Sequence, residues 1–448
     1  MKSKLRQSRG KAAIRPAQES ASRIDGPLLV RIEKPIYGGA FLARIEGKAI
    51  FVPLTLPGEQ ARVRITQDKR GYATAESEEI VVAAPERVEP ACPYFAACGG
   101  CHYQHADYAT QLALKQSILR ETLQRAGVQP PSSVAVIAGN PWQYRNRIRL
   151  AFDAAGNPGY RGRRSHAVIP ISECPIAAPL LLQATRAAAS IVRESVPALR
   201  PIEIALFCNA DETALLASVF IANHAQIRFD DFCHALQERI PALQGAKLVT
   251  EGRAGQPSRT LANWGATSLT YRAAGFAYRV DHGAFFQVNR FLVDALVDSV
   301  TAGHSGKLAW DLFAGVGLFA RRLTQSYERV VAVESAPSAI PALDSNLSAT
   351  PGTAVRSTTL DFLRHSRTLE RPNLIVVDPP RTGLGPEITS LLAEIAAPTL
   401  VYVSCDPATL GRDLRALLAA GYSIHRLTLA DLFPQTFHLE TIVELRRS

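Results

Sequence analysis

Short runs of alternating apolar and polar residues fill the segment from Pro27 to Val82, and glycine or proline residues separate them. The runs are LLVRIEKPIY, GAFLARIEG, KAIFVPL, ARVRITQ and GYATAESEEIVV. A period of two is typical of β-strands that bury one face, and the glycines and prolines mark turns. The pattern predicts a small five-stranded β-barrel of the OB type.

The chain then changes to a mixture of helical and strand-like patterns. A helical pattern covers Tyr108 to Ala126. Strand-like runs such as RNRIRLAFDA, IEIALFCNA and ALLASVFIA follow, interleaved with the helix-like runs LLLQATRAAASIVRE and DDFCHALQERI. This mixture predicts an α+β middle domain that extends to about Val280.

Beyond Val280 the pattern becomes regular. The apolar strand candidates KLAWDLF, RVVAVES, NLIVVDPP and TLVYVSCD each end in a polar or glycine-rich turn and precede a helical pattern. Repeated βα units predict an α/β domain with a doubly wound, Rossmann-like parallel sheet. The expected segments are a basic disordered tail (1–23), the barrel (24–85), the middle domain (86–281) and the α/β domain (282–448).

The composition of the chain also predicts the kind of partner that it binds and the compartment in which it works. Lys and Arg number 50 against 40 Asp and Glu, and the net charge of +10 favours a polyanionic partner, although a merely basic enzyme stays an alternative. A barrel beside a basic tail favours RNA binding over an SH3-like module without a nucleic-acid role. The first 23 residues lack the apolar core of a secretory signal, and no apolar stretch is long enough for a membrane span. We therefore expect a cytoplasmic protein without membrane contact.

Four of the seven cysteines form a pattern typical of metal ligands. Three lie together in CPYFAACGGCHYQH and one follows in ISECPI, at positions Cys92, Cys98, Cys101 and Cys174. The two glycines of the first motif allow its loop to curl so that thiols face inward, and a reducing compartment disfavours disulfides. Zinc bound by four cysteines is a serious alternative to an iron-sulfur cluster, although structural zinc usually uses two CxxC-like pairs. Radical chemistry is disfavoured because four ligands leave no iron open to a substrate.

A glycine turn between a strand and a helix indicates a cofactor site. The turn starts at Asp311 in DLFAGVGLFA, and Gly315 and Gly317 allow the backbone to approach a ligand closely. Glu334 ends the next strand, where a carboxylate can accept both hydroxyls of a ribose. A nicotinamide cofactor would prefer GxGxxG, whereas GxG preceded by an acid suits S-adenosylmethionine, which has no phosphate.

Reactive side chains follow the next strands of the predicted sheet. Asp378 and Arg381 emerge after the apolar run NLIVV, and Cys405 follows the strand after it. Because ligands bind at the carboxyl edge of such sheets, a thiol there is more plausible as a nucleophile than as a buried apolar residue. His438 and Glu440 alternate ahead of the last strand and can face the same side of it.

Taken in order, these motifs resemble the RNA uracil-5-methyltransferase family over nearly the whole chain. The matching segments are CPYFAACGGCHYQH, FFQVN, DLFAGVG, VDPPR, SCDPATLGRDL and PQTFHLE. The segment PIYGGAFLARIEGKAIFVPLTLPGE resembles the RNA-binding barrel known as the TRAM domain. The barrel and the cysteines together resemble the branch that methylates 23S ribosomal RNA. The resemblance implies a class I methyltransferase domain, a TRAM barrel and an iron-sulfur middle domain in a monomeric enzyme.

The resemblance also implies roles for individual residues. It implies that Cys92, Cys98, Cys101 and Cys174 hold a 4Fe-4S cluster, that Gln287, Phe313, Glu334 and Asp378 contact S-adenosylmethionine, and that Cys405 is the nucleophile and Glu440 the general base. Two positions depart from the family pattern. Leu318 replaces a frequent polar residue and removes a potential contact with the cofactor, and Asp406 replaces the usual Asn of SCNP. We expect the Asp406 carboxylate to raise the pKa of the Cys405 thiol by like-charge repulsion.

The implied reaction is methylation of uracil C5 through a covalent adduct between the Cys405 thiol and C6. Three alternatives stay open. A tRNA uridine would use the same chemistry. DNA amino-methyltransferases also carry an acid-Pro-Pro loop, but there an aromatic residue usually follows, and Arg381 together with Cys405 argues against this class. A non-catalytic iron-sulfur RNA-binding protein would give Cys405 and Glu440 no reason to lie near the cofactor turn.

Overall fold

The computed structural model describes residues 26–222, 228–250, 258–366 and 370–447. Two compact units divide the chain, one with residues up to Lys34 together with Phe41–Ala83, the other with Pro35–Ala40 and Ala84–Ser448. The basic tail predicted for residues 1–23 lies outside the described residues. Within the described ranges, no helix has the length and apolar character needed to cross a membrane.

The predicted five-stranded barrel is confirmed. It is closed, with the strand order β1-β2-β3-β5-β4. The strands are β1 (Leu28–Pro35), β2 (Ala40–Ile45), β3 (Lys48–Pro53), β4 (Gln60–Asp68) and β5 (Tyr72–Val82). Alternate residues such as Val30, Ile50 and Val63 are buried inside, whereas Arg62 and Arg64 of β4 lie outside and pair with glutamates of β5. The alternation in the sequence therefore matches the two faces of the barrel wall.

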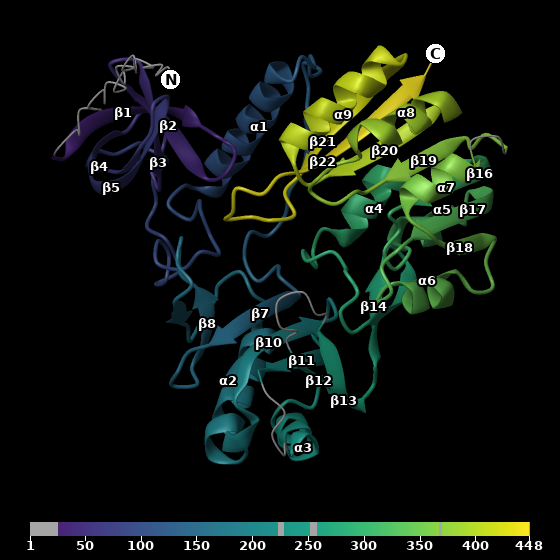
Figure 1. Cartoon of the computed structure of the whole chain (residues 1–448), viewed down its shortest axis with the longest axis horizontal. Helices are drawn as coiled ribbons and strands as arrows, with labels where there is room; N and C mark the ends of the chain where they lie inside the picture. The colour runs from purple at the N-terminus through teal and green to yellow at the C-terminus, as the bar shows by residue number, and fades with distance from the viewer. Residues whose placement is uncertain (1–25, 223–227, 251–257, 367–369, 448) are drawn as a thin grey trace, which may run out of the picture. The chain divides into compact units, whose positions relative to one another are not determined.

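A seven-stranded sheet with two helices on one face follows (Figure 1). Its order is β13 (Arg259–Gly265), β12 (Leu243–Thr250), β11 (Leu215–Ile221), β10 (Pro201–Cys208), β7 (Arg147–Phe152), β8 (Pro158–Arg161) and β9 (Val168–Pro170). The helices α2 (Pro179–Glu194) and α3 (Phe229–Arg239) pack on this sheet through one apolar core. The hairpin of β14 (Ser268–Ala273) and β15 (Phe276–Asp281) leads to the next sheet.

The C-terminal part forms an eight-stranded sheet in which five neighbouring strands are parallel. The order is β18 (Gly352–Arg356), β17 (Tyr327–Glu334), β16 (Gly306–Leu312), β19 (Leu374–Val377), β20 (Thr399–Ser404), β22 (Glu440–Arg447), β21 (Tyr422–Ala430) and β6 (Ala135–Ile137). The chain proceeds from β16 outward to β18 and then returns to β19 on the other side of β16. Ligands bind at such a reversal, outside the carboxyl ends of the strands.

Helices cover both faces of the eight-stranded sheet, as the predicted doubly wound fold requires. Apolar residues of α4 (Val293–Thr301), α5 (Leu318–Leu323) and α6 (Ile340–Leu347) share one core with the sheet. Those of α1 (Tyr108–Arg125), α7 (Thr359–Ser366), α8 (Gly385–Ile395) and α9 (Pro407–Ala419) share the other.

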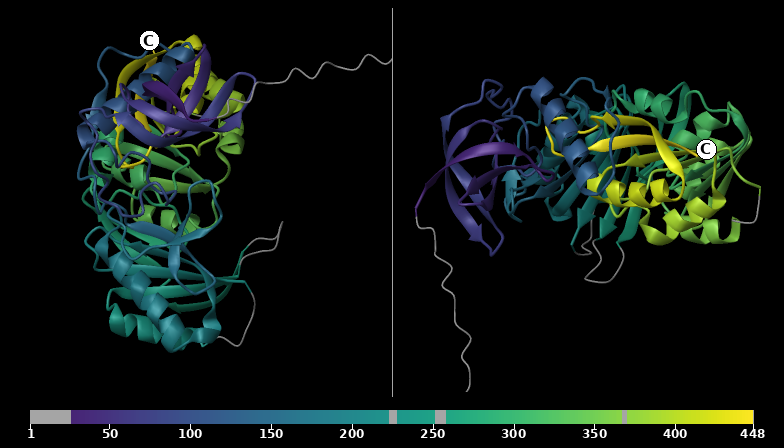
Figure 2. Two further views of the ribbon diagram at one scale, coloured as in Figure 1. Left: turned by 90° about the vertical axis from the view of Figure 1, so that its left-hand side faces the viewer. Right: turned by 90° about the horizontal axis from the view of Figure 1, so that it is seen from above.

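The structure differs from the expected division of the chain at two elements. The helix predicted from Tyr108 is present as α1, but it packs against α9 and not on the middle sheet (Figures 1 and 2). Its buried Ile118, Leu119 and Leu123 join the core of the eight-stranded sheet, and β6 adds an edge strand to that sheet beside β21. A helical pattern shows which face is buried but not which partner covers it, so segments within 86–281 contribute to both sheets.

Candidate active site

Asp378, Cys405 and Glu440 lie at the ends of three consecutive strands of the eight-stranded sheet. Asp378 follows β19, Cys405 follows β20, and Glu440 begins β22, which runs antiparallel to β20. Ser404 pairs with Thr441, so Cys405 and Glu440 are each one residue beyond a paired position, at the same edge. The topology thus gathers a thiol and two carboxyl groups beside the chain reversal.

Burial and mutual repulsion govern the protonation of these groups. Burial raises the pKa of the Cys405 thiol to about 11, and the nearby charges of Glu440 and Asp378 add to this shift, while Arg381 opposes it. Burial also raises the pKa of Asp378 to about 7. The Glu440 pKa is raised by burial and then by Asp378. The thiol is therefore protonated at neutral pH, and it would have to lose a proton to act as a nucleophile.

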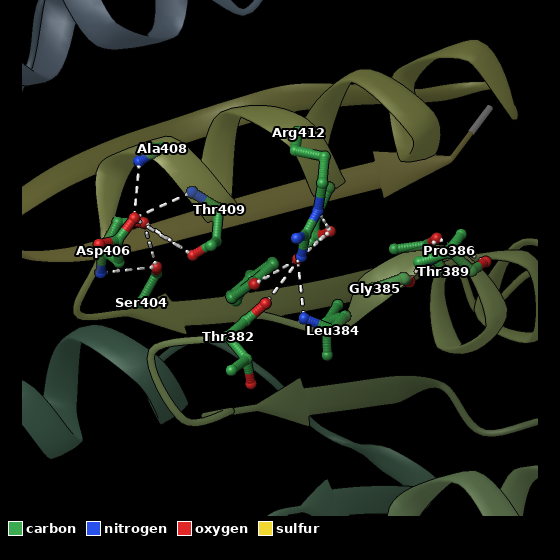
Figure 3. Close-up of polar contacts among 12 residues, drawn as sticks. Thr382, Leu384, Gly385, Pro386, Thr389, Ser404, Asp406, Ala408, Thr409 and Arg412 are labelled. Atoms are coloured by element: carbon green, nitrogen blue, oxygen red, sulfur yellow. Dashed lines mark hydrogen bonds and ion pairs between the residues drawn. The ribbon is translucent and has the colours of Figure 1, made fainter.

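Asp406 has a role other than the one expected from the sequence. Its carboxylate caps α9, because Oδ1 accepts hydrogen bonds from the backbone N–H groups of Ala408 at 2.9 Å and Thr409 at 3.0 Å (Figure 3). The like charges that act on the thiol are those of Glu440 and Asp378. The expectation that Asp406 repels the thiolate is corrected in this way, since a carboxylate at a helix N-terminus is stabilised by the N–H groups there.

His438 is poorly suited to accept a proton. Its Nδ1 accepts a hydrogen bond from the Arg381 guanidinium, with Nη2 at 3.1 Å. Burial and the Arg381 charge lower the pKa of His438 to about 3. The imidazole is therefore neutral at neutral pH and already uses its acceptor nitrogen. Of His438 and Glu440, Glu440 is therefore better suited to act as a base.

The predicted cofactor turn adopts a left-handed backbone at three positions. The φ angles are 67° at Phe313, 57° at Gly315 and 87° at Gly317, just before α5. Glu334 Oε2 accepts a hydrogen bond from the Gly315 N–H at 2.8 Å, which ties the end of β17 to this turn. Glu334 Oε1 accepts hydrogen bonds from the N–H groups of Ser335 and Ala336, each at 2.6 Å. A carboxylate has about four acceptor positions, so Glu334 retains one, on Oε2, for a ribose hydroxyl.

Asp311 is a buried acid at the start of the same turn. Its Oδ2 accepts a hydrogen bond from the Ala320 N–H at 2.8 Å, while Oδ1 is buried without a partner among the described residues. Burial raises its pKa to about 7. The sequence identified Asp311 as the acid that precedes GxG without giving it a role. An unsatisfied buried acceptor is costly, so Oδ1 indicates a ligand that donates to it.

Gln287 lies apart from these strand ends in sequence but close to the turn through packing. It is buried in the connection between β15 and α4, and its carbonyl accepts a hydrogen bond from Asn146 Nδ2 at 2.9 Å. The neighbouring Phe286 packs against Tyr278, with ring centroids 6.2 Å apart, and the Tyr278 hydroxyl donates to the carbonyl of Leu318 just after the turn, at 3.1 Å. Of the four residues assigned to the cofactor, Phe313 and Asp378 follow adjoining strands, Glu334 ends another, and Gln287 lies in this connection.

The four cysteines assigned to a cluster line one cavity of about 110 Å³, here named the cysteine cavity: Cys92, Cys98, Cys101 and Cys174. All four are free thiols. In the described part of the chain, no group of three or more His, Cys, Asp or Glu side chains is arranged to hold a metal ion. Cys208 and Cys233 are buried elsewhere, in the apolar core between the seven-stranded sheet and its helices.

Buried polar contacts fix the loop that precedes Glu440, named here the catalytic loop (residues 431–439). The buried Lys115 on α1 pairs with Asp431, with Nζ–Oδ1 at 2.5 Å. The backbone N–H groups of His102 and Tyr103 donate to the carbonyl of Gln435 at 2.8 and 3.0 Å. The loop that follows Cys101 is therefore bonded directly to the catalytic loop. Sequence reasoning missed these anchors, because a polar residue in a helical pattern does not reveal a distant partner.

Comparison with known proteins identifies two matching families along the chain. Residues 262–448 match the family described as tRNA (Uracil-5-)-methyltransferase, and residues 28–77 match the TRAM domain. The chain is 33% identical to an uncharacterized RNA methyltransferase of Streptomyces avermitilis, over 93% of this chain and 97% of that protein. It is 31% identical to the 23S rRNA (uracil(1939)-C(5))-methyltransferase RlmD of Pseudomonas putida, over 92% of each.

A solved structure has the same fold. The tRNA (uracil-54, C5)-methyltransferase of Pyrococcus abyssi, in complex with S-adenosyl-L-homocysteine, superposes with a TM-score of 0.74. The match covers 93% of this chain and 100% of that chain at 22% sequence identity. At this identity the likeness concerns the fold, which is that of class I methyltransferases.

Proposed function

Because the chain belongs to the RNA uracil-5-methyltransferase family, we propose that it transfers a methyl group from S-adenosylmethionine to C5 of a uridine in 23S ribosomal RNA. The observation that carries the proposal is the meeting of Cys405, Glu440 and Asp378 at one sheet edge, beside the turn that starts at Asp311. A thiol nucleophile and a carboxylate base are the groups that this reaction requires.

Ribosomal RNA is supported by the relatives that cover most of the chain. The Pseudomonas putida and Pseudomonas entomophila proteins, both named as 23S rRNA (uracil(1939)-C(5))-methyltransferases, are 31% and 32% identical to it. Transfer RNA is the second candidate, because the matching family and the Pyrococcus abyssi structure carry tRNA in their descriptions. Both substrates would undergo the same chemistry.

Mapping 5-methyluridine in cellular RNA tests the substrate. In a strain that lacks this protein, we expect 5-methyluridine to disappear from a position in 23S rRNA and to persist in tRNA. Mass spectrometry of nuclease digests of the two purified RNA classes measures this, and a copy of the gene that encodes Cys405→Ala serves as the control for catalysis. Loss of 5-methyluridine from tRNA alone would instead identify tRNA as the substrate.

The reaction begins with activation of uracil, because C5 is too weak a nucleophile to take a methyl group unaided. The Cys405 thiol gives up its proton and its sulfur attacks C6, which places electron density on C5. Asp378 and Glu440 repel each other in a buried site, so one of the two is ionised more readily than the other. Asp378, whose pKa is raised to about 7, takes the thiol proton and returns it to the sulfur when the C6–S bond breaks, so Glu440 stays ionised for its own step. Asp378 would also bind the Watson–Crick edge of a flipped uracil.

Glu440 completes the reaction after methyl transfer. S-Adenosylmethionine, when bound, supplies the methyl group on a positively charged sulfur. The Glu440 carboxylate then removes the proton from C5, and the C6–S bond breaks to release Cys405 and the methylated uracil. A raised pKa makes the ionised Glu440 a stronger proton acceptor than an exposed glutamate.

The turn and the strand ends around it are suited to hold the cofactor. The Glu334 carboxylate would accept a ribose hydroxyl, and the unpartnered Oδ1 of Asp311 would accept a hydrogen bond from a donor of the cofactor. Phe313 and Gln287 complete the set that we assign to this site. Gly315 supports this use, because it is left-handed and a Cβ there would meet no protein atom within 4 Å, which leaves the backbone open to a ligand.

We further propose that the cysteine cavity holds a 4Fe-4S cluster. The proposal is supported by the four free thiols, which come from two separate segments of the chain and line one cavity. Cysteine thiolates are the ligands of 4Fe-4S clusters, and zinc bound by the same four thiols is the alternative. The cluster would supply rigidity to the loop that holds Gln435 through His102 and Tyr103.

Protein purified without oxygen is therefore expected to be brown, with about four irons per chain. Cys101→Ser should remove most of the iron and lower both the melting temperature and methyl transfer, because the loop that anchors Gln435 loses its support. Iron and zinc analysis, absorption near 400 nm and thermal unfolding measure these effects. Cys233→Ala, in the core away from the cavity, should retain the iron. One zinc per chain instead of iron would contradict the cluster.

A further inference from the structure

A second, larger cavity of about 470 Å³ lies on the seven-stranded sheet. Four basic residues and a histidine line it and define what we name the cationic cavity: Arg145, Arg147, Arg149, Lys247 and His282. It is built on the face opposite to the core with α2 and α3. None of the residues assigned to catalysis or to S-adenosylmethionine lines it. Its volume lies in the range of about 300–1,000 Å³ that is typical of ligand sites.

Strand register explains why this face is hollow and basic. Arg149 pairs with Ala205, Ala205 with Ser218, and Ser218 with Lys247, so the four residues form one row across four strands. Neighbouring strands lie about 4.8 Å apart, which places the ends of the row about 14 Å from each other. The small side chains of Ala205 and Ser218 leave space between the two basic ends.

Aromatic rings hold the guanidinium groups in place. Arg147 lies over the ring of Phe207 and Arg149 over that of Phe220, each at 4.3 Å from the ring centroid. Arg147 Nη1 also donates to the carbonyl of Ala284 at 2.7 Å. Cation–π contacts and this hydrogen bond orient the planar groups before any ligand binds.

The positive charge of the cavity is compensated only in part, since Arg145 also lines the cysteine cavity while, in the described part of the chain, Arg147 and Lys247 face no acid of their own. Asp281 is the one acid in its lining, and it is bound by Arg279, with Nη2–Oδ1 at 2.7 Å. Arg149 pairs with Glu203. Among the described residues, Arg147 and Lys247 form no ion pair, and their pKa values are lowered, that of Arg147 to about 10 by burial and that of Lys247 by burial and the Arg147 charge.

Two buried guanidinium donors also lack a partner in the described part of the structure. They are Nε of Arg147 and Nε of Arg145, which also lines the cysteine cavity. Buried polar groups are rarely left unsatisfied, so this set indicates a ligand with several acceptor oxygens. Phosphate groups carry such oxygens, and arginine side chains are the groups that most often bind them with defined geometry.

We propose that the cationic cavity binds a nucleotide of the RNA substrate other than the methylated uridine, with its backbone phosphate held by Lys247 and Arg147. This inference rests on the proposed function, because it takes RNA as the substrate. The volume accommodates more than a phosphate group, and guanidinium planes offer surfaces on which an unpaired base can stack. Gly283 and Val288 form part of the wall and flank Gln287, so an RNA strand bound here lies near the predicted cofactor site.

Lys247→Gln tests the cavity with little change in side-chain volume. We expect it to weaken binding of a 23S rRNA fragment about tenfold and to reduce the slope of log Kd against log salt by about one. The affinity for S-adenosylhomocysteine and the rate of methyl transfer at saturating RNA should stay unchanged. Lys247→Arg should retain wild-type affinity. Arg193→Gln, exposed on α2 at the other face of the same sheet, is the matched control and should bind RNA normally.

The outcomes separate this inference from the proposed function. Wild-type affinity of Lys247→Gln for RNA, in a protein that still forms 5-methyluridine, would overturn the cavity assignment alone. If the wild-type protein forms no 5-methyluridine but Lys247→Gln still loses RNA affinity, the cavity stands and the proposed function fails. Binding of inorganic phosphate that depends on Lys247, without any effect on RNA affinity, would assign the cavity to a free anion and overturn the proposal.

Discussion

Replacing Cys405 with alanine is expected to abolish methyl transfer, with a loss of at least about 10⁴-fold, while both substrates still bind. Without the thiol no bond to C6 can form, so C5 never acquires the electron density that it needs. The side chain is only half-buried at the end of β20, and alanine leaves the strand pairing from Thr399 to Ser404 intact. Transfer of a radiolabelled methyl group to RNA, with RNA and S-adenosylhomocysteine binding measured in parallel, gives the result.

The protonation of Cys405 supplies an independent readout for the same residue. Because its pKa is raised to about 11, alkylation by iodoacetamide in the RNA-free protein should keep accelerating from pH 7 to above pH 9. Cys233→Ala serves as the control and should transfer methyl groups at the wild-type rate. Measurable turnover by Cys405→Ala would exclude a covalent route through this thiol.

Glu440→Gln is expected to stop the reaction one step later. The amide is nearly isosteric but cannot take the C5 proton, so the enzyme should stall as an adduct between Cys405 and methylated uracil. Turnover should fall by about 10²–10⁴-fold, the usual contribution of a general base. A protein–RNA band that survives denaturation, and that is absent when Cys405 is also replaced, identifies the adduct.

Glu444 offers a matched control on the same strand. It is buried like Glu440, but it pairs with Arg426 and Arg446 away from the catalytic edge. Glu444→Gln should lower stability without trapping RNA. Normal turnover by Glu440→Gln without an adduct would instead assign the base to another group. His438 is a weak candidate for that role, because its pKa is lowered to about 3 and Arg381 occupies its Nδ1.

Most of the fold could be predicted from sequence patterns that repeat every two to four residues. The alternation in β1 to β5 predicted the barrel, and the apolar runs at Lys307, Arg329, Asn373 and Thr399 predicted the parallel strands β16, β17, β19 and β20. These features depend on residues two to four positions apart, which share a face of one strand or helix. The placement of Asp378 and Cys405 at strand ends followed from the same patterns, since parallel strands end at a common edge. Their chemical roles stay predictions.

The sequence by itself determined the elements, the strand ends that carry reactive groups and the four clustered cysteines. Only the tertiary structure decided that α1 packs on the eight-stranded sheet, that Lys115 and the loop after Cys101 hold the catalytic loop, and that separated strands assemble the cationic cavity. The physical reason is that burial, charge repulsion and buried ion pairs act between groups that are far apart in the sequence. A pKa or a cavity depends on which surfaces meet, and periodicity within one element shows only which of its faces is buried.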